Sequence, residues 1–334
     1  MSNNEAIIRT PNTEHRTPNT EHRTPNTEHR TPNTHKSALK ILVCYYDSYG
    51  IPYTDDGIMF PIQAGKALTD TGLHIQGDNE LNGRPCDNIS SKNPSYSELT
   101  ALYWAWKNLK KLYPDVKYVG WSHYRRFFAL NEERYFTDTI YKSSSDIPNY
   151  RIDSDKIISI LEAGKIILVK KRVFSFPLNI QFSVYHSSID YSILKDIIRK
   201  KFPDYYDTFV NFMEHNNKIS LYCMFIMKYE DFERYCEWLF AVLSEVEPLI
   251  PFQYYNTYQK RVFAFMAERL LNVYVIKNGL KPEYSSIYFY GDKRTYKRIL
   301  RTSNSIFVRF GWYIFRMLRS CRSKLIFRLL RLWP

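Results

Sequence analysis

Apolar residues along the chain form runs of two kinds, and each kind predicts a different element. Short runs rich in β-branched and aromatic residues predict strands, whereas longer runs with apolar residues three and four positions apart predict helices. The predicted strands cover 39–46, 115–124, 165–170 and, as a strand or a buried segment, 220–228. The predicted helices cover 95–113, 154–164, 187–201, 204–215, 229–247 and 258–279. Strands that alternate with helices predict an α/β fold with a mainly parallel central sheet.

The segment YVGWSHYRRFFAL (118–130) puts polar side chains where a predicted central strand ends. In open sheets of this class, ligands bind beyond the carboxyl ends of the strands. His123, Tyr124, Arg125 and Arg126 are therefore candidate ligand contacts. Two guanidinium groups suit an anion, and phosphate matches their forked geometry. The alternative is that both arginines pair with structural carboxylates and that His123 caps a loop.

A second polar segment, CDNISSKN (86–93), leads into the predicted helix at 95. A helix N-terminus favours a bound anion. We therefore expect this loop to contact uridine, ribose or phosphate, and its candidate residues are Asp87, Asn88, Ser90, Lys92 and Asn93. The alternative is a turn built from capping residues, which Asx and Ser sequences often form.

Charge is distributed unevenly along the 334 residues, whose formal net charge is +13. Residues 292–334 hold 12 Lys and Arg against one Asp, whereas the rest holds 35 Lys and Arg against 33 Asp and Glu. A nucleic-acid-binding domain more often carries its charge on a folded face, so we expect no nucleic-acid partner. The predicted organisation is a tail at 1–37, one folded domain at 38–290 and a basic tail at 291–334.

Residues 9–34 repeat the unit Thr-Pro-Asn-Thr-Glu-His-Arg, which has no apolar side chain. Such a segment cannot bury surface to offset the entropy of ordering, so it predicts a disordered tail. The unit can be encoded by the seven bases ACACCGA read in three successive frames. Gain or loss of one seven-base copy would shift the reading frame, so we hypothesise phase variation. Genes switched in this way commonly build or modify the bacterial cell surface.

The cysteines and the apolar runs bear on the compartment. Five cysteines occur without metal-ligand or redox spacing, and no signal peptide or long uncharged span is recognised. These patterns predict a cytoplasmic protein with free thiols. The segment 305–334 mixes arginines with apolar residues at roughly helical spacing, which predicts a helix lying on the anionic inner face of the cytoplasmic membrane. The alternatives are a helix that docks on a partner or on the folded body.

Several segments together resemble one protein family. They are PIQAGKAL (61–68), DNISSKNPSYSELTALYWAWKN (87–108), YVGWSHYRRFF (118–128), MFIMKYEDFERYCEWLF (224–240) and YQKRVFAFMAERLLNVYV (258–275). In this order, they resemble the bacterial capsular and exopolysaccharide glycosyltransferases that were long classified as a domain of unknown function. The resemblance covers roughly 39–280. The chain departs from the family pattern at Ala264, where Gly is common, and at Cys223, where Asn is common.

The resemblance implies a GT-A-like, Rossmann-like enzyme that uses a nucleotide-diphosphate sugar. Family members belong to capsule, O-antigen and lipooligosaccharide gene clusters, and several are linked to galactose transfer. The expected function is therefore transfer of a hexose, with galactose as one possibility, from a UDP-sugar to a lipid-linked glycan at the membrane. The competing interpretations are a catalytically inactive scaffold of polysaccharide assembly and, less favoured, a nucleic-acid-binding module.

Glycosyl transfer requires that the leaving diphosphate be neutralised and that the acceptor hydroxyl lose a proton. Where many GT-A enzymes carry Asp-x-Asp, this chain has Ser-His-Tyr-Arg-Arg at 122–126. We therefore expect Arg125 and Arg126, with Lys92, to neutralise the diphosphate without an obligatory metal. The alternative is Mn²⁺ or Mg²⁺ held by acids such as Asp78 or Asp87.

Glu268 is the first candidate for the base, and Asp87 or His123 is the second. Glu268 and Arg269 interrupt an otherwise apolar helical segment, so one or both are expected to face the interior. The alternative is an internal Glu–Arg ion pair that stabilises the helix.

Overall fold

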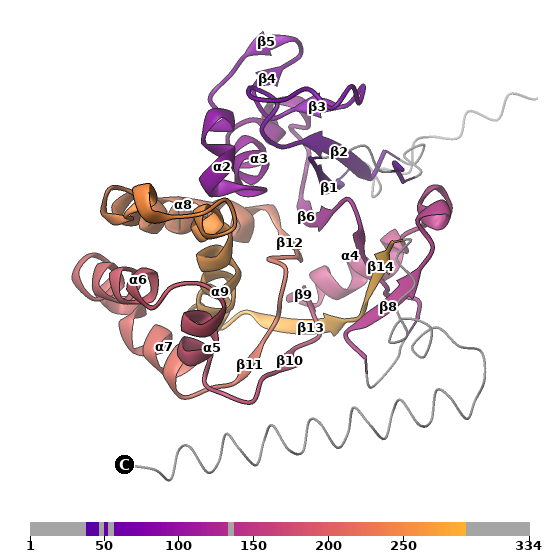
Figure 1. Cartoon of the computed structure of the whole chain (residues 1–334). Coiled ribbons are helices and arrows are strands. Elements are labelled where there is room, and N and C mark those ends of the chain that lie inside the picture. Colours follow the sequence, from indigo (N-terminus) through magenta and orange to yellow (C-terminus); the bar gives the residue numbers. More distant parts are fainter. Residues whose placement is uncertain (1–37, 47–49, 53–56, 133–136, 292–334) are drawn as a thin grey trace, which may run out of the picture. The chain divides into compact units, whose positions relative to one another are not determined.

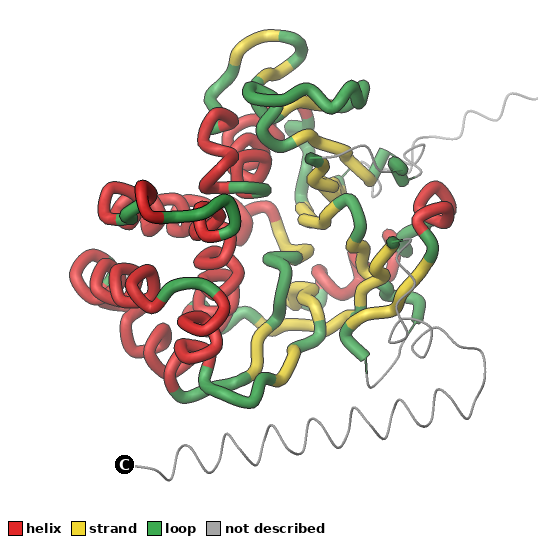
Figure 2. Tube along the Cα trace, viewed as in Figure 1, coloured by secondary structure: helices red, strands yellow, loops and turns green. Residues whose placement is uncertain are grey.

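The computed structural model describes residues 38–46, 50–52, 57–132 and 137–291 of the chain (Figures 1 and 2). The predictions for the heptapeptide repeat and for the basic tail fall outside these residues. Within them, strands alternate with helices along the chain, as the apolar pattern predicts. The predicted domain boundaries at 37/38 and 290/291 remain predictions.

A mainly parallel sheet runs through the described body. Its main path is β13-β9-β12-β6-β1-β2-β3. These strands are β1 (Leu39–Tyr45), β2 (Met59–Gln63), β3 (Gln76–Gly77), β6 (Tyr118–His123), β9 (Lys165–Val169), β12 (Phe225–Lys228) and β13 (Lys281–Ser285). The strand β12 is antiparallel to both neighbours, and all other adjacent pairs on this path are parallel. The predicted sheet is confirmed, with one reversed strand.

A short hairpin extends the sheet beyond β6. The strand β7 (Arg126–Phe128) turns back on β6 and pairs with β14 (Ile287–Tyr290), which pairs in turn with β8 (Thr139–Lys142). Two small two-stranded sheets join β4 (Glu80–Leu81) to β5 (Arg84–Pro85) and β10 (Arg172–Val173) to β11 (Lys218–Ile219). The apolar pattern did not predict these strands, because all of them are only two to four residues long.

The buried strand β1 alternates between two cores. Leu42 and Cys44 pack into the larger one, whereas Ile41 and Val43 pack into the other. Successive side chains on a strand point to opposite faces, so both faces of the sheet are covered. Gly120 of β6 permits close packing here, because a Cβ at this position would lie 2.8 Å from Ile41 Cγ1.

Helices cover both faces of the sheet. They are α2 (Asn93–Tyr96), α3 (Leu99–Leu112), α4 (Ser154–Glu162), α5 (Leu178–Tyr185), α6 (Ser188–Lys201), α7 (Pro203–Glu214), α8 (Tyr229–Val246) and α9 (Val262–Lys277). Short 3₁₀ helices lie at η1 (Ser90–Lys92), η2 (Ser144–Asn149), η3 (Glu247–Leu249), η4 (Phe252–Tyr254) and η5 (Gln259–Arg261). The later helices α5 to α9 gather on the left of Figure 1, as expected for a helical C-terminal part. The α3 helix packs its buried face into the larger core, and α4 packs into the other.

The predicted helix at 95–113 is two helices in the structure. Ser97 separates α2 from α3 with φ 50° and ψ −129°, which is not a helical conformation. The residue that precedes α3 is Glu98, and its side chain makes no capping hydrogen bond. This interruption turns the chain at the carboxyl edge of the sheet.

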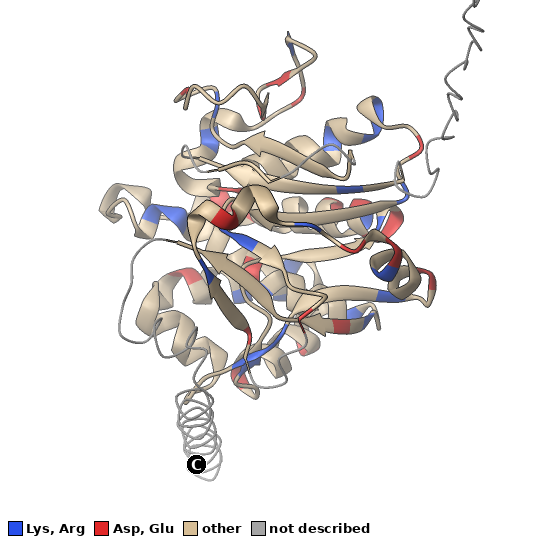
Figure 3. Ribbon diagram, turned by 90° about the vertical axis from the view of Figure 1, so that its right-hand side faces the viewer, with Lys and Arg blue, Asp and Glu red and all other residues tan. Residues whose placement is uncertain are grey.

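The surface of the described body carries charges of both signs. Figure 3 shows Lys and Arg interspersed with Asp and Glu on one side. Within the described ranges, no helix combines the length and the apolar character that a bilayer crossing requires. The four cysteines in these ranges are free thiols.

Candidate functional site

A cavity of about 510 Å³ lies at the carboxyl ends of β1 and β6. Its lining residues come from six segments that are far apart in the sequence. They are Cys44, Tyr46, Ala64, Asn93, Pro94, Ser97, Glu98, His123, Tyr124, Arg125, Arg126, Tyr222, Cys223, Thr257, Lys260, Arg261, Ala264, Phe265 and Glu268. The cavity is where an open α/β sheet is expected to bind its ligand.

The β6–β7 hairpin supplies one wall of the cavity. His123 pairs with Arg126 across the hairpin, so Tyr124 and Arg125 form its turn. The backbone N–H of Tyr124 donates to Cys44 O at 3.0 Å, and Arg125 O accepts from the N–H of Tyr290 at 2.9 Å. Backbone bonds to β1 and β14 therefore fix the hairpin on both sides.

Aromatic rings pack against both guanidinium groups of the hairpin. Arg125 Cζ lies 4.8 Å from the ring centre of Tyr124, and Arg126 Cζ lies 4.4 Å from that of Tyr222. Both also lie within 5.4 Å of the ring centre of Phe289. Rings hold a cation without neutralising it. Arg126 forms no ion pair with any carboxylate of the described residues, which favours the anion-binding interpretation for this residue.

Glu268 and His123, two of the three candidate bases, contact the same strained residue. Tyr222 and Cys223 have φ values of 72° and 54°, in the left-handed region. Glu268 Oε1 accepts from the backbone N–H of Tyr222 at 2.6 Å, and His123 Nε2 bonds the carbonyl oxygen of Tyr222 at 2.7 Å. A non-glycine residue in this region costs about 1–3 kcal/mol and persists only when its surroundings hold it. Glu268 and His123 supply such support on both sides of Tyr222.

His123 is a buried ring that favours its neutral form. Burial lowers the pKa of His123, with a smaller lowering from the nearby Arg126, while the charge of Glu98 opposes the shift. A carbonyl oxygen only accepts, so Nε2 of the neutral ring carries the proton and donates to Tyr222 O. This contact matches the loop-holding alternative for His123. Its role as a base remains a prediction.

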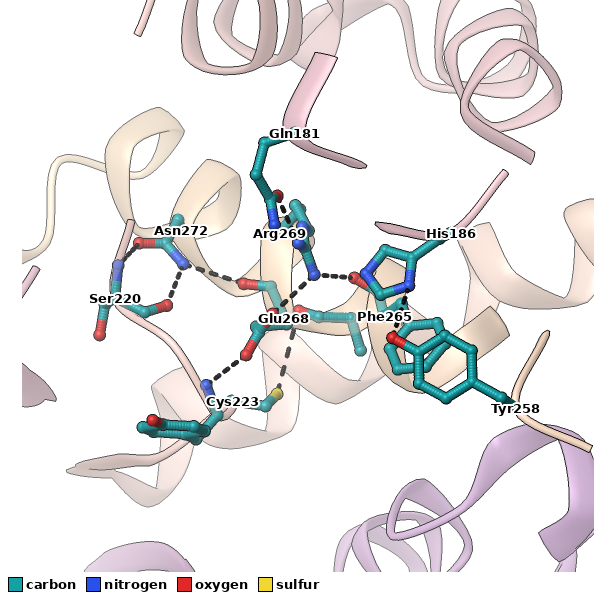
Figure 4. Close-up of polar contacts among 11 residues, drawn as sticks. Gln181, His186, Ser220, Cys223, Tyr258, Phe265, Glu268, Arg269 and Asn272 are labelled. Atoms are coloured by element: carbon teal, nitrogen blue, oxygen red, sulfur yellow. Dashed lines mark hydrogen bonds and ion pairs between the residues drawn. The ribbon is translucent and has the colours of Figure 1, made fainter. Parts of the chain in front are cut away.

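The second carboxylate oxygen of Glu268 faces inward. Glu268 Oε2 accepts from Arg269 Nη1 at 2.6 Å, and Arg269 also donates to Phe265 O and to Gln181 Oε1 (Figure 4). Arg269 is only 2% exposed, and burial lowers its pKa. The internal Glu–Arg ion pair expected as the alternative is therefore present. The base role of Glu268 remains a prediction.

Of the five candidates in the segment 86–93, only Asn93 lines the cavity. Asp87 accepts from the hydroxyl of Tyr103, and Asn88 forms a local turn by donating to Cys86 O and accepting from the N–H of Ser90. Lys92 forms an ion pair with Glu247 at 2.7 Å. The predicted contacts of this loop with a nucleotide remain predictions, and its contacts in the structure match the capping-turn alternative.

The carboxylate of Asp78 holds the same loop from inside. Asp78 is fully buried and accepts from the N–H groups of Gly65 and Lys66 at 2.8 and 3.0 Å and from the Ser90 hydroxyl. It is therefore fully engaged in turn formation. Among the described residues, no group of three or more His, Cys, Asp or Glu side chains is arranged to hold a metal ion. The hydrogen bonds of Asp78 leave its carboxylate less accessible to a metal ion, and the alternative metal site at Asp78 or Asp87 remains a prediction.

Three charged lining residues were not predicted from the sequence: Glu98, Lys260 and Arg261. Lys260 and Arg261 precede α9 in the segment YQKRVF, within one of the segments that resemble the family. Basic residues before a helix are ordinary surface residues, so only their place beside the hairpin makes them notable. Glu98 was hidden inside the segment predicted as one continuous helix.

Strained backbone is concentrated at this cavity. Among the described residues, four non-glycine residues have positive φ, and Ser97, Tyr222 and Cys223 among them line the cavity. The Ser97 turn is held by Asn93 Nδ2, which donates to Ser97 O at 2.8 Å. Asn93 packs closely on Gly65, where a Cβ would lie 2.6 Å from Asn93 Cγ. Strained residues persist only where the surrounding structure holds them, and they cluster at functional sites.

Comparisons with known proteins agree with this architecture. A solved structure described as the apo form of WbbM, a bifunctional glycosyltransferase, matches with 28% sequence identity and a TM-score of 0.65. The match covers 76% of this chain and 46% of WbbM, so the chain spans less than half the length of that protein. The likeness confirms the predicted GT-A-like α/β fold. A search of curated proteins gave no match. The model of the domain of unknown function DUF4422 matches residues 40–279, and the chain belongs to this family.

Proposed function

We propose that this protein is a glycosyltransferase that moves a hexose from a nucleotide-diphosphate sugar to a surface-glycan precursor. The observation that carries the proposal is the cavity at the carboxyl ends of β1 and β6, which combines Arg125 and Arg126 with the carboxylates of Glu98 and Glu268. This reaction needs cations that neutralise the leaving diphosphate and a carboxylate that accepts the proton of the acceptor hydroxyl. The likeness to the glycosyltransferase WbbM supports the same class.

The donor is proposed to bind with its diphosphate against the hairpin. Arg126 lies over the ring of Tyr222 and has no carboxylate partner among the described residues, so its charge is available to an anion. Lys260 and Arg261 bring further positive charge to the same cavity. Stabilising negative charge as it develops on a leaving group is often the largest contribution to catalysis.

Thermal unfolding with nucleotide sugars tests this proposal. The full chain is melted with UDP, UDP-galactose and UDP-glucose, because a ligand that binds only the folded state raises the melting temperature. We expect one UDP-sugar to stabilise the protein, with UDP-galactose tested first. If no nucleotide sugar stabilises a folded sample, the scaffold alternative is favoured over the enzyme.

The same melts test how the diphosphate is neutralised. The proposal that arginines perform this role predicts that stabilisation by the UDP-sugar persists in excess EDTA. Stabilisation that appears only with Mn²⁺ or Mg²⁺ would favour a metal-dependent enzyme. In that case the metal ligands would differ from Asp78, whose carboxylate is occupied by Gly65, Lys66 and Ser90.

The acceptor is proposed to be a lipid-linked precursor of capsule, O-antigen or lipooligosaccharide, reached at the inner face of the cytoplasmic membrane. The support is the basic, amphipathic sequence of 305–334. Deletion of 305–334 is expected to move the protein from the membrane fraction to the soluble fraction. An unchanged distribution would remove the membrane role from this segment.

Phase variation is proposed for the gene. Its support is the heptapeptide repeat at 9–34, which a seven-base repeat can encode in three frames. Sequencing the gene tests it directly. Uninterrupted copies of one seven-base unit are expected, and synonymous codons that break the unit would rule the mechanism out.

A further inference from the structure

The cavity contains a second carboxylate that the sequence patterns did not single out. Glu98 lies between the turn at Ser97 and the first residue of α3, and it lines the cavity. Its side chain is 20% exposed, so it is partly buried yet reachable. Its nearest charged partner among the described residues is Arg261, whose Nη2 lies 3.9 Å from Glu98 Oε2. At that distance the pair is too long for a hydrogen bond.

Glu98 and Glu268 differ in how their oxygens are used. Glu268 gives Oε1 to the N–H of Tyr222 and Oε2 to Arg269, at 2.6 Å in both cases. Protonating Glu268 would weaken its pair with a buried guanidinium and loosen the strained turn at Tyr222. Glu98 makes no side-chain hydrogen bond within the described residues, so its oxygens are free to meet a hydroxyl group. A general base needs a lone pair within hydrogen-bond reach of the proton that it removes.

The backbone next to Glu98 is held firmly. Ser97 O accepts from Asn93 Nδ2 at 2.8 Å, and Ser97 Oγ accepts from Arg261 Nε at 3.1 Å. These two bonds tie the left-handed Ser97 to α2 on one side and to η5 on the other. This fixed turn places the backbone of Glu98 at the wall of the cavity and so limits the region that its carboxylate can reach.

The electrostatics of His123 point the same way. Among the charges that raise the pKa of His123 against the effect of burial, Glu98 ranks before Glu268. The charge of Glu98 therefore acts on His123, at the carboxyl end of β6. This is the part of the cavity in which Arg125 and Arg126 would face the diphosphate.

We propose that Glu98 is the catalytic base of this site, and that Glu268 and His123 are positioning residues that hold the turn at Tyr222. The inference rests on the proposed glycosyltransferase function. The acceptor O–H gives its proton to the Glu98 carboxylate, and the acceptor oxygen forms a bond to the anomeric carbon of the sugar. The bond from that carbon to the diphosphate oxygen breaks, and its electron pair leaves with the diphosphate beside Arg125 and Arg126.

The experiment compares the full chain with its E98Q, E268Q and E237Q variants. Glu237 is an exposed residue of α8 outside the cavity, so E237Q is the matched control. UDP release from UDP-galactose and from UDP-glucose is measured in water and in the presence of azide. Azide is an anionic acceptor that needs no deprotonation, so it can replace water when the base is missing. The UDP-induced rise in melting temperature reports donor binding separately.

For E98Q, we expect UDP release in water to fall by about 10²–10⁴-fold, the usual contribution of a general base. Azide should restore the release, and the UDP-induced rise should match that of E237Q. For E268Q, we expect a lower melting temperature, because the Tyr222 turn loses its charged support. For the same reason, azide should not restore the UDP release that this variant loses.

Four results would overturn the inference. Release by E98Q at the wild-type rate would remove Glu98 as the base. Loss of the UDP-induced rise in E98Q, or failure of azide to restore release, would make Glu98 a residue that shapes the cavity and takes no proton. A wild-type protein that neither binds UDP nor releases it from either donor would instead refute the proposed function, and the inference with it.

Discussion

The loop at 86–93 and the hairpin at 123–126 look alike in the sequence and differ in the structure. Both are polar segments at the edge of apolar elements, and both resemble a ligand-binding loop. In the loop, Ser90 bonds the buried Asp78, Asn88 closes a local turn, and Lys92 pairs with Glu247. In the hairpin, the cationic group of Arg126 is surrounded by aromatic rings and lines the cavity.

The difference follows from the reach and the chemistry of the side chains. Asn, Ser and Asp are short and bond nearby backbone groups, so a turn rich in them satisfies itself. Arginine has five donors and no acceptor, and a ring holds it without consuming those donors. A polar segment is therefore a stronger candidate for a ligand site when its charged groups are held by rings than when they are held by backbone and carboxylates.

The largest expected effect tests the structural role of the loop. Asp78→Ala removes the acceptor of two backbone N–H groups and one hydroxyl in a buried setting. Each buried donor left without a partner costs about 1–3 kcal/mol, so we expect the free energy of unfolding to fall by about 3 kcal/mol or more. Urea unfolding measures this change. A variant of unchanged stability that no longer responds to UDP would instead make the loop part of the donor site.

The helices and the four central strands β9, β12, β6 and β1 were predictable, whereas the outer strands were not, and the site was predictable only in part. Apolar periodicity is a local signal, so it located the strands that end at Tyr45 and His123 and the helices that cover them. It also located the carboxyl end of the central strand at His123, where an open sheet binds its ligand.

The rest depends on contacts between distant segments. The left-handed turns at Ser97 and Tyr222 are maintained by the side chains of Asn93, Glu268 and His123. No local sequence pattern predicts a strained turn of this kind. Glu98 reaches the cavity only because the chain turns at Ser97. The inward orientation of the Glu268–Arg269 pair was foreseeable from its apolar surroundings, whereas its contact with Tyr222 was not.

The second test addresses the hairpin. Arg126→Ala removes a cation that has no ion-pair partner among the described residues, so we expect stability to change by about 1 kcal/mol or less. Hydrogen bonds to a charged group are worth about 1.5–3 kcal/mol, so UDP affinity should fall roughly 10- to 100-fold. Titration calorimetry measures the affinity, and Arg199→Ala on the exposed surface of α6 is the control. Equal UDP affinity in both variants would contradict the anion-binding role.

The third test uses acid to probe a buried ring that packs beside the cavity and does not contact the loop. His186 stacks on the cavity residue Phe265, and burial, with the nearby Arg269 and Arg261, lowers the pKa of His186 to about 3. Between that value and the ordinary pKa of about 6.5, the unfolded chain binds a proton that the folded chain does not. Stability should therefore fall as the pH drops through this window, by at most about 1.4 kcal/mol per pH unit from this ring, and by less where water screens it.

His186→Phe keeps a stacking ring and removes the titration, so it should flatten this dependence. Urea unfolding at a series of pH values measures it. The loop variant Asp78→Ala should keep the slope attributed to His186, because the two side chains share no contact. A His186→Phe protein with an unchanged slope would show that this ring does not titrate as its burial implies.

The smallest expected effect distinguishes the loop from the donor site most directly. Lys92→Ala breaks an ion pair with Glu247 in which the side chains are 45% and 28% exposed. Exposed ion pairs are worth about 0–1 kcal/mol, so stability should change little. Lys165→Ala breaks a comparably exposed pair with Glu283 and is the matched control. If Lys92 only stabilises the loop, both variants should bind UDP as the wild type does. Weaker binding by Lys92→Ala alone would show that Lys92 contacts the donor, and the loop would then differ less from the hairpin.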